Sequence, residues 1–254
     1  MYKIAYFQLF ILFATLIFWK LFYTSSCAIF ITVAFVVISF LTLSFAEGSL
    51  LYRKSVAHVI FYDTSWMFVW LQSKWIVLLK SLFQAMFFGI LLLINIIEWQ
   101  SNLVLIMSLD ILFLIALYIW LLKKVKLHVK EDVQHIVAKK IAISLNIIVM
   151  TPILITTLFY SNPPTYLEPS LTASLQNAQT LSATVQCGIV KLLYSYDLFK
   201  EAFAWWGMMQ LSLHVQYQGL SFLGWTLFLS LETLYMWIYS KLILSTTNDI
   251  KAIF

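Results

Sequence analysis

The sequence predicts an all-α integral membrane protein, and three observations lead to this fold class. Of its 254 residues, 62% are hydrophobic and only 11% are charged, whereas a soluble domain has about 25% charged residues. Several nearly uncharged windows approach the roughly 20 residues with which a helix crosses the ~30 Å hydrocarbon layer. A chain of this length is also too short to bury so many apolar side chains in one water-soluble core. We therefore expect a single polytopic membrane domain over residues 1–254.

Six apolar runs, each bounded by charges or turn residues, are the predicted membrane spans. They cover residues 4–23, 27–46, 75–97, 103–122, 141–160 and 220–240. The turn Thr24-Ser25-Ser26 makes a helical hairpin of the first two spans. Pro152 predicts a kink inside the fifth span, and Asn162-Pro163-Pro164 ends that span.

The segments between the spans divide into cytoplasmic and outer parts. Residues 47–74 mix apolar, aromatic and basic side chains, a pattern that predicts an interfacial amphipathic helix before the third span. In the strongly charged segment 123–140, the apolar residues follow helical spacing, which predicts a short surface helix. We expect both segments to be cytoplasmic.

Residues 161–219 are the longest predicted non-spanning segment and should form an outer helical region. Apolar residues between Leu171 and Val185 recur every three or four positions, which predicts an amphipathic helix after Pro169-Ser170. Asp197 is the predicted N-cap of a second helix in this region.

The basic residues predict the orientation of the chain. With the N-terminus in the cytoplasm, all of the 16 basic residues except Lys20, Lys191 and Lys200 lie on the cytoplasmic side. Cytoplasmic loops retain Lys and Arg, so we expect both termini inside, in a bacterial inner (cytoplasmic) membrane. The net charge of +5 is then explained by basic residues that set the orientation in the membrane. No nucleic-acid partner is expected.

Asp110 and Glu232 are acids inside predicted spans. Counted from the outer face at 1.5 Å per residue, Asp110 lies about 11 Å deep and Glu232 about 18 Å deep. An acid near the bilayer centre costs about 2.5–3.5 kcal/mol to insert. Such residues usually face a bundle interior, a cavity or a partner, so both are candidate site residues.

Three interpretations of these acids remain open. Asp110 and Glu232 could face each other as a proton- or cation-handling pair, although no Lys, Arg or His is predicted at their depth. Each could instead be a protonated acid hydrogen-bonded to Asn95, Thr233, Tyr235 or a backbone group, since burial favours the neutral form. Each could also contact a group on another subunit. The last two interpretations make the acids structural.

Two further constellations are weaker candidates. His128, Asp132 and His135 lie at i, i+4 and i+7 of the predicted surface helix and could hold a divalent metal; a solvated or partner-docking helix is the favoured interpretation. Cys27 and Cys187 are both predicted outside, where they could form a disulfide. Two buried free thiols are the alternative.

Basic residues of the two cytoplasmic segments are predicted to dock anionic lipid or a soluble partner. They are Arg53, Lys54, Lys123, Lys124, Lys126, Lys130, Lys139 and Lys140.

Catalytic motifs are missing from the sequence. It contains no Gly-rich phosphate loop, G-x-S-x-G, H-E-x-x-H or C-x-x-C pattern. We therefore expect that the protein is not an enzyme, has no catalytic residue and binds no cofactor. Gly (6) and Pro (4) are scarce, whereas alternating-access transporters usually carry Gly/Pro-interrupted spans.

These observations predict a non-catalytic membrane subunit of a larger assembly, such as a secretion, transport or energy-coupling complex. The expected partners are the lipid bilayer, other membrane subunits and a cytoplasmic protein or ATPase. One alternative is a proton- or cation-handling protein that uses Asp110 and Glu232.

The layout of the chain is similar to that of ABC-2 type permeases. The shared features are six spans with both ends inside, Glu47 closing the second span, a cytoplasmic segment before the third, and outer helices before the sixth. The usual cytoplasmic amphipathic helix before the first span is missing. The resemblance implies an exporter permease that works with a separate ATPase docked through residues 47–74.

Overall fold

The computed structural model describes an all-helical chain. The described residues are 2–60, 73–97, 99, 101–160, 165–168, 170–213 and 218–245. The helices are α1 (Tyr2–Phe22), α2 (Cys27–Ile60), α4 (Lys74–Ile97), α5 (Ser101–Val125), α6 (Glu131–Tyr160), α7 (Leu171–Ser182), α8 (Gly188–Leu213) and α9 (Gln218–Leu244).

Several of these helices are long and apolar enough to cross a membrane. Within the described part of the chain, 4 segments meet this criterion: Cys27–Ser49, Lys74–Ile97, Ser101–Val125 and Val133–Leu154. Residues Leu9–Phe22 of α1 form a shorter apolar helix. The prediction of a helical, multi-pass membrane protein is thereby confirmed. The predicted sixth span falls on α9, several of whose side chains before Glu232 lie outside the described residues.

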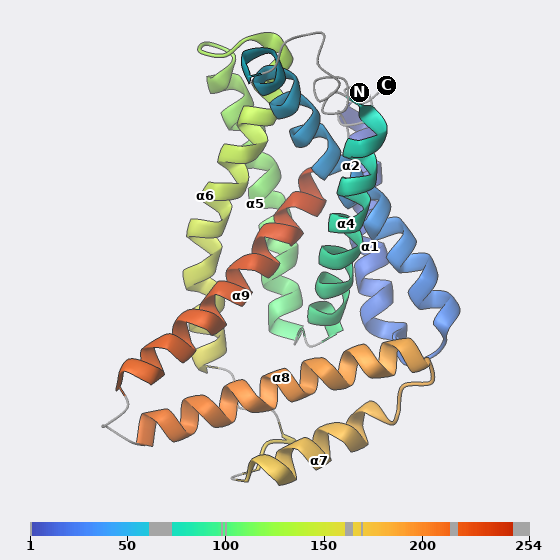
Figure 1. Ribbon diagram of the computed structural model, residues 1–254, viewed down its shortest axis with the longest axis vertical. Coiled ribbons are helices and arrows are strands. Elements are labelled where there is room, and N and C mark those ends of the chain that lie inside the picture. Colours follow the sequence, from blue (N-terminus) through green and yellow to red (C-terminus); the bar gives the residue numbers. More distant parts are fainter. Residues whose placement is uncertain are drawn as a thin grey trace.

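The long helices form a bundle, and α7 and α8 lie across one end of it (Figure 1). Within the bundle, α2 packs along α4 and α5 along α6, while α9 crosses obliquely and contacts α2, α4, α5 and α6. Helix α1 begins and α9 ends toward the bundle end that is opposite α8 (Figure 1).

Small side chains bring α2 and α4 close together. On α4, Ser81 and Ala85 are fully buried, and Gly89 continues the same i, i+4 row. A Cβ placed on Gly89 would lie 3.2 Å from Ile38 Cγ1 of α2, so even an added methyl group would require the Ile38 side chain to shift. Rows of small residues at this spacing let membrane helices approach closely.

Residues 47–60 do not begin a separate interfacial helix, contrary to the prediction. Helix α2 continues without a break from Cys27 to Ile60, 34 residues in all, or about 51 Å at 1.5 Å per residue. The hydrocarbon layer is ~30 Å thick, so α2 is longer than a single span requires. Gly48 is the only helix-weakening residue in the extension, and a lone glycine costs only about 1 kcal/mol. Residues 61–72 lie outside the described residues.

The predicted surface helix over 123–140 is also wrong, because the segment divides between two long helices. Helix α5 runs to Val125, a short turn follows, and α6 begins at Glu131. In the turn, the His128 and Val129 amides donate to the Val125 carbonyl at 3.0 Å each. Basic residues at the end of α5 and acidic residues at the start of α6 suit the dipoles of those two helix ends.

Pro152 lies inside α6, which continues to Tyr160. The kink predicted at this residue stays a prediction, and Asn162-Pro163-Pro164 lies outside the described residues.

The outer region forms two helices that pack on each other. Ser170 caps α7, since its hydroxyl accepts from the Ala173 amide at 3.1 Å. Helix α8 begins at Gly188, so Asp197 lies inside it and is not the predicted N-cap. The Asp197 carboxylate instead pairs with Lys200, one turn later on the same helix.

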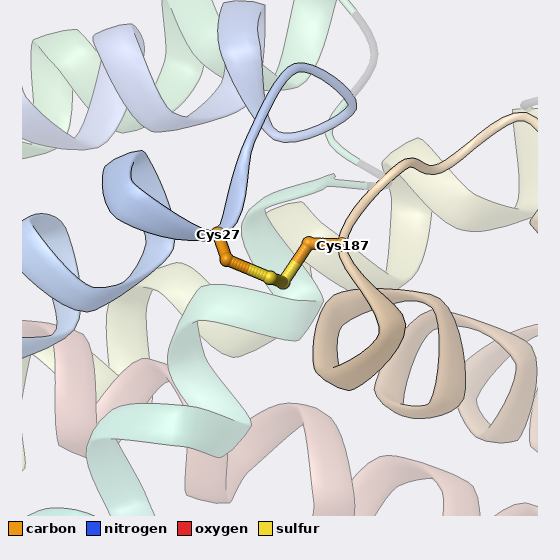
Figure 2. The surroundings of a disulfide bond; sticks show 2 residues. All are labelled: Cys27 and Cys187. Atoms are coloured by element: carbon orange, nitrogen blue, oxygen red, sulfur yellow. A yellow bond between two sulfur atoms is a disulfide. The ribbon is translucent and has the colours of Figure 1, made fainter.

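A disulfide between Cys27 and Cys187 joins the first residue of α2 to the residue before α8 (Figure 2). The two Cα atoms are 4.8 Å apart. Beside the bridge, the Gln186 amide donates to the Thr24 carbonyl at 3.1 Å. The hairpin turn between α1 and α2 is therefore tied covalently to the outer helices.

We predict that Cys187→Ser destabilises the protein and releases one thiol. The bridge closes a loop with a sequence separation of 160 residues, and loss of a native disulfide typically costs about 2–4 kcal/mol. The oxidised wild type should migrate faster than Cys187→Ser on a non-reducing gel and should unfold at a higher temperature in the same detergent. Cys27→Ser is the matched control and should behave identically. Two maleimide-reactive thiols in the unreduced, denatured wild type would contradict the bridge.

Candidate functional site

Three polar side chains from different helices meet in the interior of the bundle. The Asn146 amide of α6 donates to Asp110 Oδ2 of α5 at 3.3 Å and to Ser240 Oγ of α9 at 3.1 Å. Asp110 is 2% exposed, and Asn146 and Ser240 are fully buried. We call these three residues the Asp110 cluster.

Helical spacing explains why the cluster faces inward. Asp110 lies among the buried residues Met107, Ile111 and Leu114 of α5. Asn146 lies one turn from the buried residues Ala142 and Met150 of α6. Each polar residue therefore occupies the apolar stripe by which its own helix packs.

A second contact fastens α9 to α5 at the same level. The Tyr239 hydroxyl donates to the Met107 carbonyl at 2.8 Å, and both residues are buried. Neighbouring residues of α9, Tyr239 and Ser240, thus bind α5 and α6 respectively.

Glu232 lies apart from the Asp110 cluster. Ser240, which contacts the cluster, follows Glu232 by eight residues, or about 12 Å along the helix. Glu232 instead interacts electrostatically with Lys200, Asp197 and Glu201 of α8. A basic residue therefore comes near Glu232, although none was predicted at its depth, because α8 lies against α9.

The other predicted hydrogen-bonding partners of the acids have neighbours of their own. Asn95 accepts from Trp99 Nε1 at 3.1 Å near the end of α4. The Tyr235 hydroxyl accepts from Lys200 at 3.3 Å, and the Thr233 hydroxyl donates to the Leu229 carbonyl.

A buried ion pair joins α2 to α6. Lys139 Nζ lies 2.9 Å from Glu47 Oε2, and both residues are less than 10% exposed. Lys139 was predicted to dock lipid or a partner, but its side chain points inward from the face of α6 that also carries the buried residues Gln134 and Ala138.

The remaining predicted docking lysines lie on the surface. Lys123, Lys124, Lys126, Lys130 and Lys140 are all exposed. The side chains of Arg53 and Lys54 lie outside the described residues.

The weak metal candidate does not assemble in the described part of the chain. His135 Nδ1 lies 3.0 Å from the Tyr118 hydroxyl, while His128 is exposed in the turn before α6. The Asp132 side chain is not among those described. Among the described residues, no three His, Cys, Asp or Glu side chains are grouped to hold a metal ion.

Two arrangements of basic residues were missed by sequence reasoning. Lys20 donates to the Ile97 carbonyl at 3.2 Å, and Trp19 Nε1 to the Leu93 carbonyl at 2.7 Å, so α1 satisfies carbonyls at the end of α4. Lys241 Nζ lies 3.9 Å from the Phe45 ring centroid and 4.9 Å from that of Trp237. These contacts depend on helix neighbours that spacing along the chain does not reveal.

The fold and the cluster define a helical multi-pass membrane protein with polar groups buried between its helices. No protein-family model, curated protein or solved structure matches the chain.

We predict that Lys139→Met strongly destabilises the protein, because it removes the Lys139 ammonium that lies against the buried Glu47 carboxylate. Breaking a buried pair on one side costs about 3–5 kcal/mol in soluble proteins. The double variant Glu47→Gln/Lys139→Met should unfold at a higher temperature than Lys139→Met alone.

Lys140→Met is the matched control for this measurement, since Lys140 is the exposed neighbour of Lys139. Equal melting temperatures for Lys139→Met and Lys140→Met would show that the ion pair does not stabilise the bundle.

Proposed function

We propose that the protein is a non-catalytic integral membrane subunit of a multi-protein assembly for secretion, transport or energy coupling. The buried polar side chains of the protein support this proposal, because they bind helices of this chain to one another. In the proposed setting, a bacterial inner membrane, both termini face the cytoplasm and α7 and α8 face outward.

The buried polar contacts together reach most of the bundle. The Asp110 cluster joins α5, α6 and α9, and the Glu47–Lys139 pair joins α2 to α6. Interhelical hydrogen bonds in membranes contribute about 0.6–2 kcal/mol each. Side chains engaged in this way favour a packing role over substrate chemistry.

The outer helix α8 carries an apolar surface suited to another subunit. Ile189, Leu192, Tyr196 and Phe203 are exposed, and their spacing places them on one side of the helix. The opposite side packs against the bundle and α7 through buried residues such as Leu198 and Ala202. We call these four exposed residues the α8 stripe.

The turn between α5 and α6 suits a soluble partner. Leu127 is 78% exposed there, and the exposed lysines Lys123, Lys124, Lys126 and Lys130 flank it. An apolar side chain framed by cations matches an acidic protein surface with an apolar centre.

An exporter permease of the ABC-2 type is the second candidate. The observation in its favour is the pair of helices α7 and α8 inserted immediately before α9, the last helix of the bundle. In this case the cytoplasmic partner would be a nucleotide-binding subunit.

We predict that the protein purifies from its native membrane, in mild detergent, with other membrane chains in fixed ratio. Leu192→Glu on the α8 stripe should reduce recovery of membrane partners. Leu127→Glu, a matched apolar-to-acid change, should reduce recovery of a soluble partner instead. Native mass spectrometry of each purified variant measures both effects.

The outcomes separate the candidates. A co-purifying nucleotide-binding protein lost in Leu127→Glu would favour the permease. A folded monomer that retains a transport or catalytic activity by itself would contradict the role of non-catalytic subunit.

A further inference from the structure

Two acceptor oxygens of the Asp110 cluster have no hydrogen-bond donor among the described residues. They are Asp110 Oδ1 and Asn146 Oδ1, and both atoms are inaccessible to solvent. An unpaired polar atom in a membrane interior is costly because no water is available to satisfy it. Two such oxygens on side chains that contact each other point to a missing positively charged or donating group.

The hydrogens near the cluster are already engaged. The Asn146 amide directs its two hydrogens to Asp110 and Ser240. The Ser240 hydroxyl donates to the Met236 carbonyl at 2.8 Å, and the Tyr239 hydroxyl donates to the Met107 carbonyl. Turning the Asn146 hydrogen from Asp110 Oδ2 toward Oδ1 would take this donor away from Oδ2.

Among the described residues, no cationic side chain forms an ion pair with the Asp110 carboxylate. The ion pairs found in the described part of the chain are Lys139–Glu47 and Lys200–Asp197, and neither includes Asp110. Asn146 is the polar group that faces Asp110 from α6. Tyr239 is the titratable residue of α9 near Asp110, and its hydroxyl donates a hydrogen bond to the Met107 carbonyl. A buried carboxylate that lacks a counter-charge among its described neighbours is costly unless a proton or a metal cation neutralises it.

We propose that Asp110, Asn146 and Ser240 form an intramembrane site for one monovalent cation, either a proton or an alkali-metal ion. Asp110 Oδ1 is its principal ligand. All three side chains present oxygen, the ligand that hard cations prefer. A single carboxylate balances a single charge, whereas a divalent cation such as Ca²⁺ takes 6–8 oxygen ligands. The site adds cation binding to the packing role of the Asp110 cluster, on which the proposed subunit function rests.

The test measures the melting temperature of the full chain in nanodiscs by its tryptophan fluorescence. Samples contain sodium, potassium or choline chloride at equal ionic strength, across a range of pH. Asp110→Asn keeps the shape of the side chain and removes its charge. Glu232→Gln is the matched control, because it neutralises the other intramembrane acid and leaves the Asp110 cluster intact.

Either cation gives a distinct result. If an alkali ion binds, sodium or potassium raises the melting temperature of the wild type and Glu232→Gln by several degrees over choline, and Asp110→Asn loses this rise. If a proton binds, the wild type and Glu232→Gln melt at lower temperature as pH rises, because the folded state holds a proton that the unfolded state has released. Asp110→Asn then loses the part of this pH dependence that Glu232→Gln retains. Equal salt and pH dependence in wild type and Asp110→Asn would overturn the proposal.

Ser240→Ala keeps the inference testable if Asp110→Asn does not fold. This change retains the carboxylate and removes one oxygen from the cluster. The alkali-ion or proton concentration at half effect should rise about threefold to tenfold, the equivalent of one hydrogen bond. An unchanged midpoint in a folded Ser240→Ala variant would exclude Ser240 from the site and contradict the proposal as stated.

Discussion

The packing of α9 through the bundle is the interaction on which the other contacts depend. This helix contacts α2, α4, α5, α6 and α8. Its Tyr239 and Ser240 satisfy polar groups of α5 and α6 in a region where water cannot do so. Because these contacts require Tyr239 to face α5 and Ser240 to face α6, they restrict the register of α9 against its neighbours.

The outer helices extend this constraint to the bundle end. Helices α7 and α8 share a small apolar core around Tyr166, Ala178 and Leu198. The disulfide anchors one end of α8 at the start of α2. Further along α8, Lys200 reaches the Tyr235 hydroxyl of α9. Helix α8 is thus held at both the α2 and the α9 side of the bundle, and this position explains why Glu232 has charged neighbours.

Sequence reasoning succeeded where a signal is local. Apolar length predicted the long helices, and the residues before Leu171 correctly placed the start of α7. It failed at Asp197 and at the segments 47–60 and 123–140, where charged residues were interpreted as element boundaries. A helix can continue through charged residues when they pair with a neighbour, as Asp197 does with Lys200.

By itself, the sequence determined that this chain is helical and multi-pass, because hydrocarbon accepts only long apolar segments with internally bonded backbones. It also identified Asp110 as an acid inside a predicted span. Only the tertiary structure decided that Asn146, and not Glu232, is the hydrogen-bond partner of Asp110, and that Asn146 also binds Ser240. It also decided that Lys139 is buried against Glu47. Such pairs join residues far apart in the chain, so helix packing selects them and helical spacing cannot.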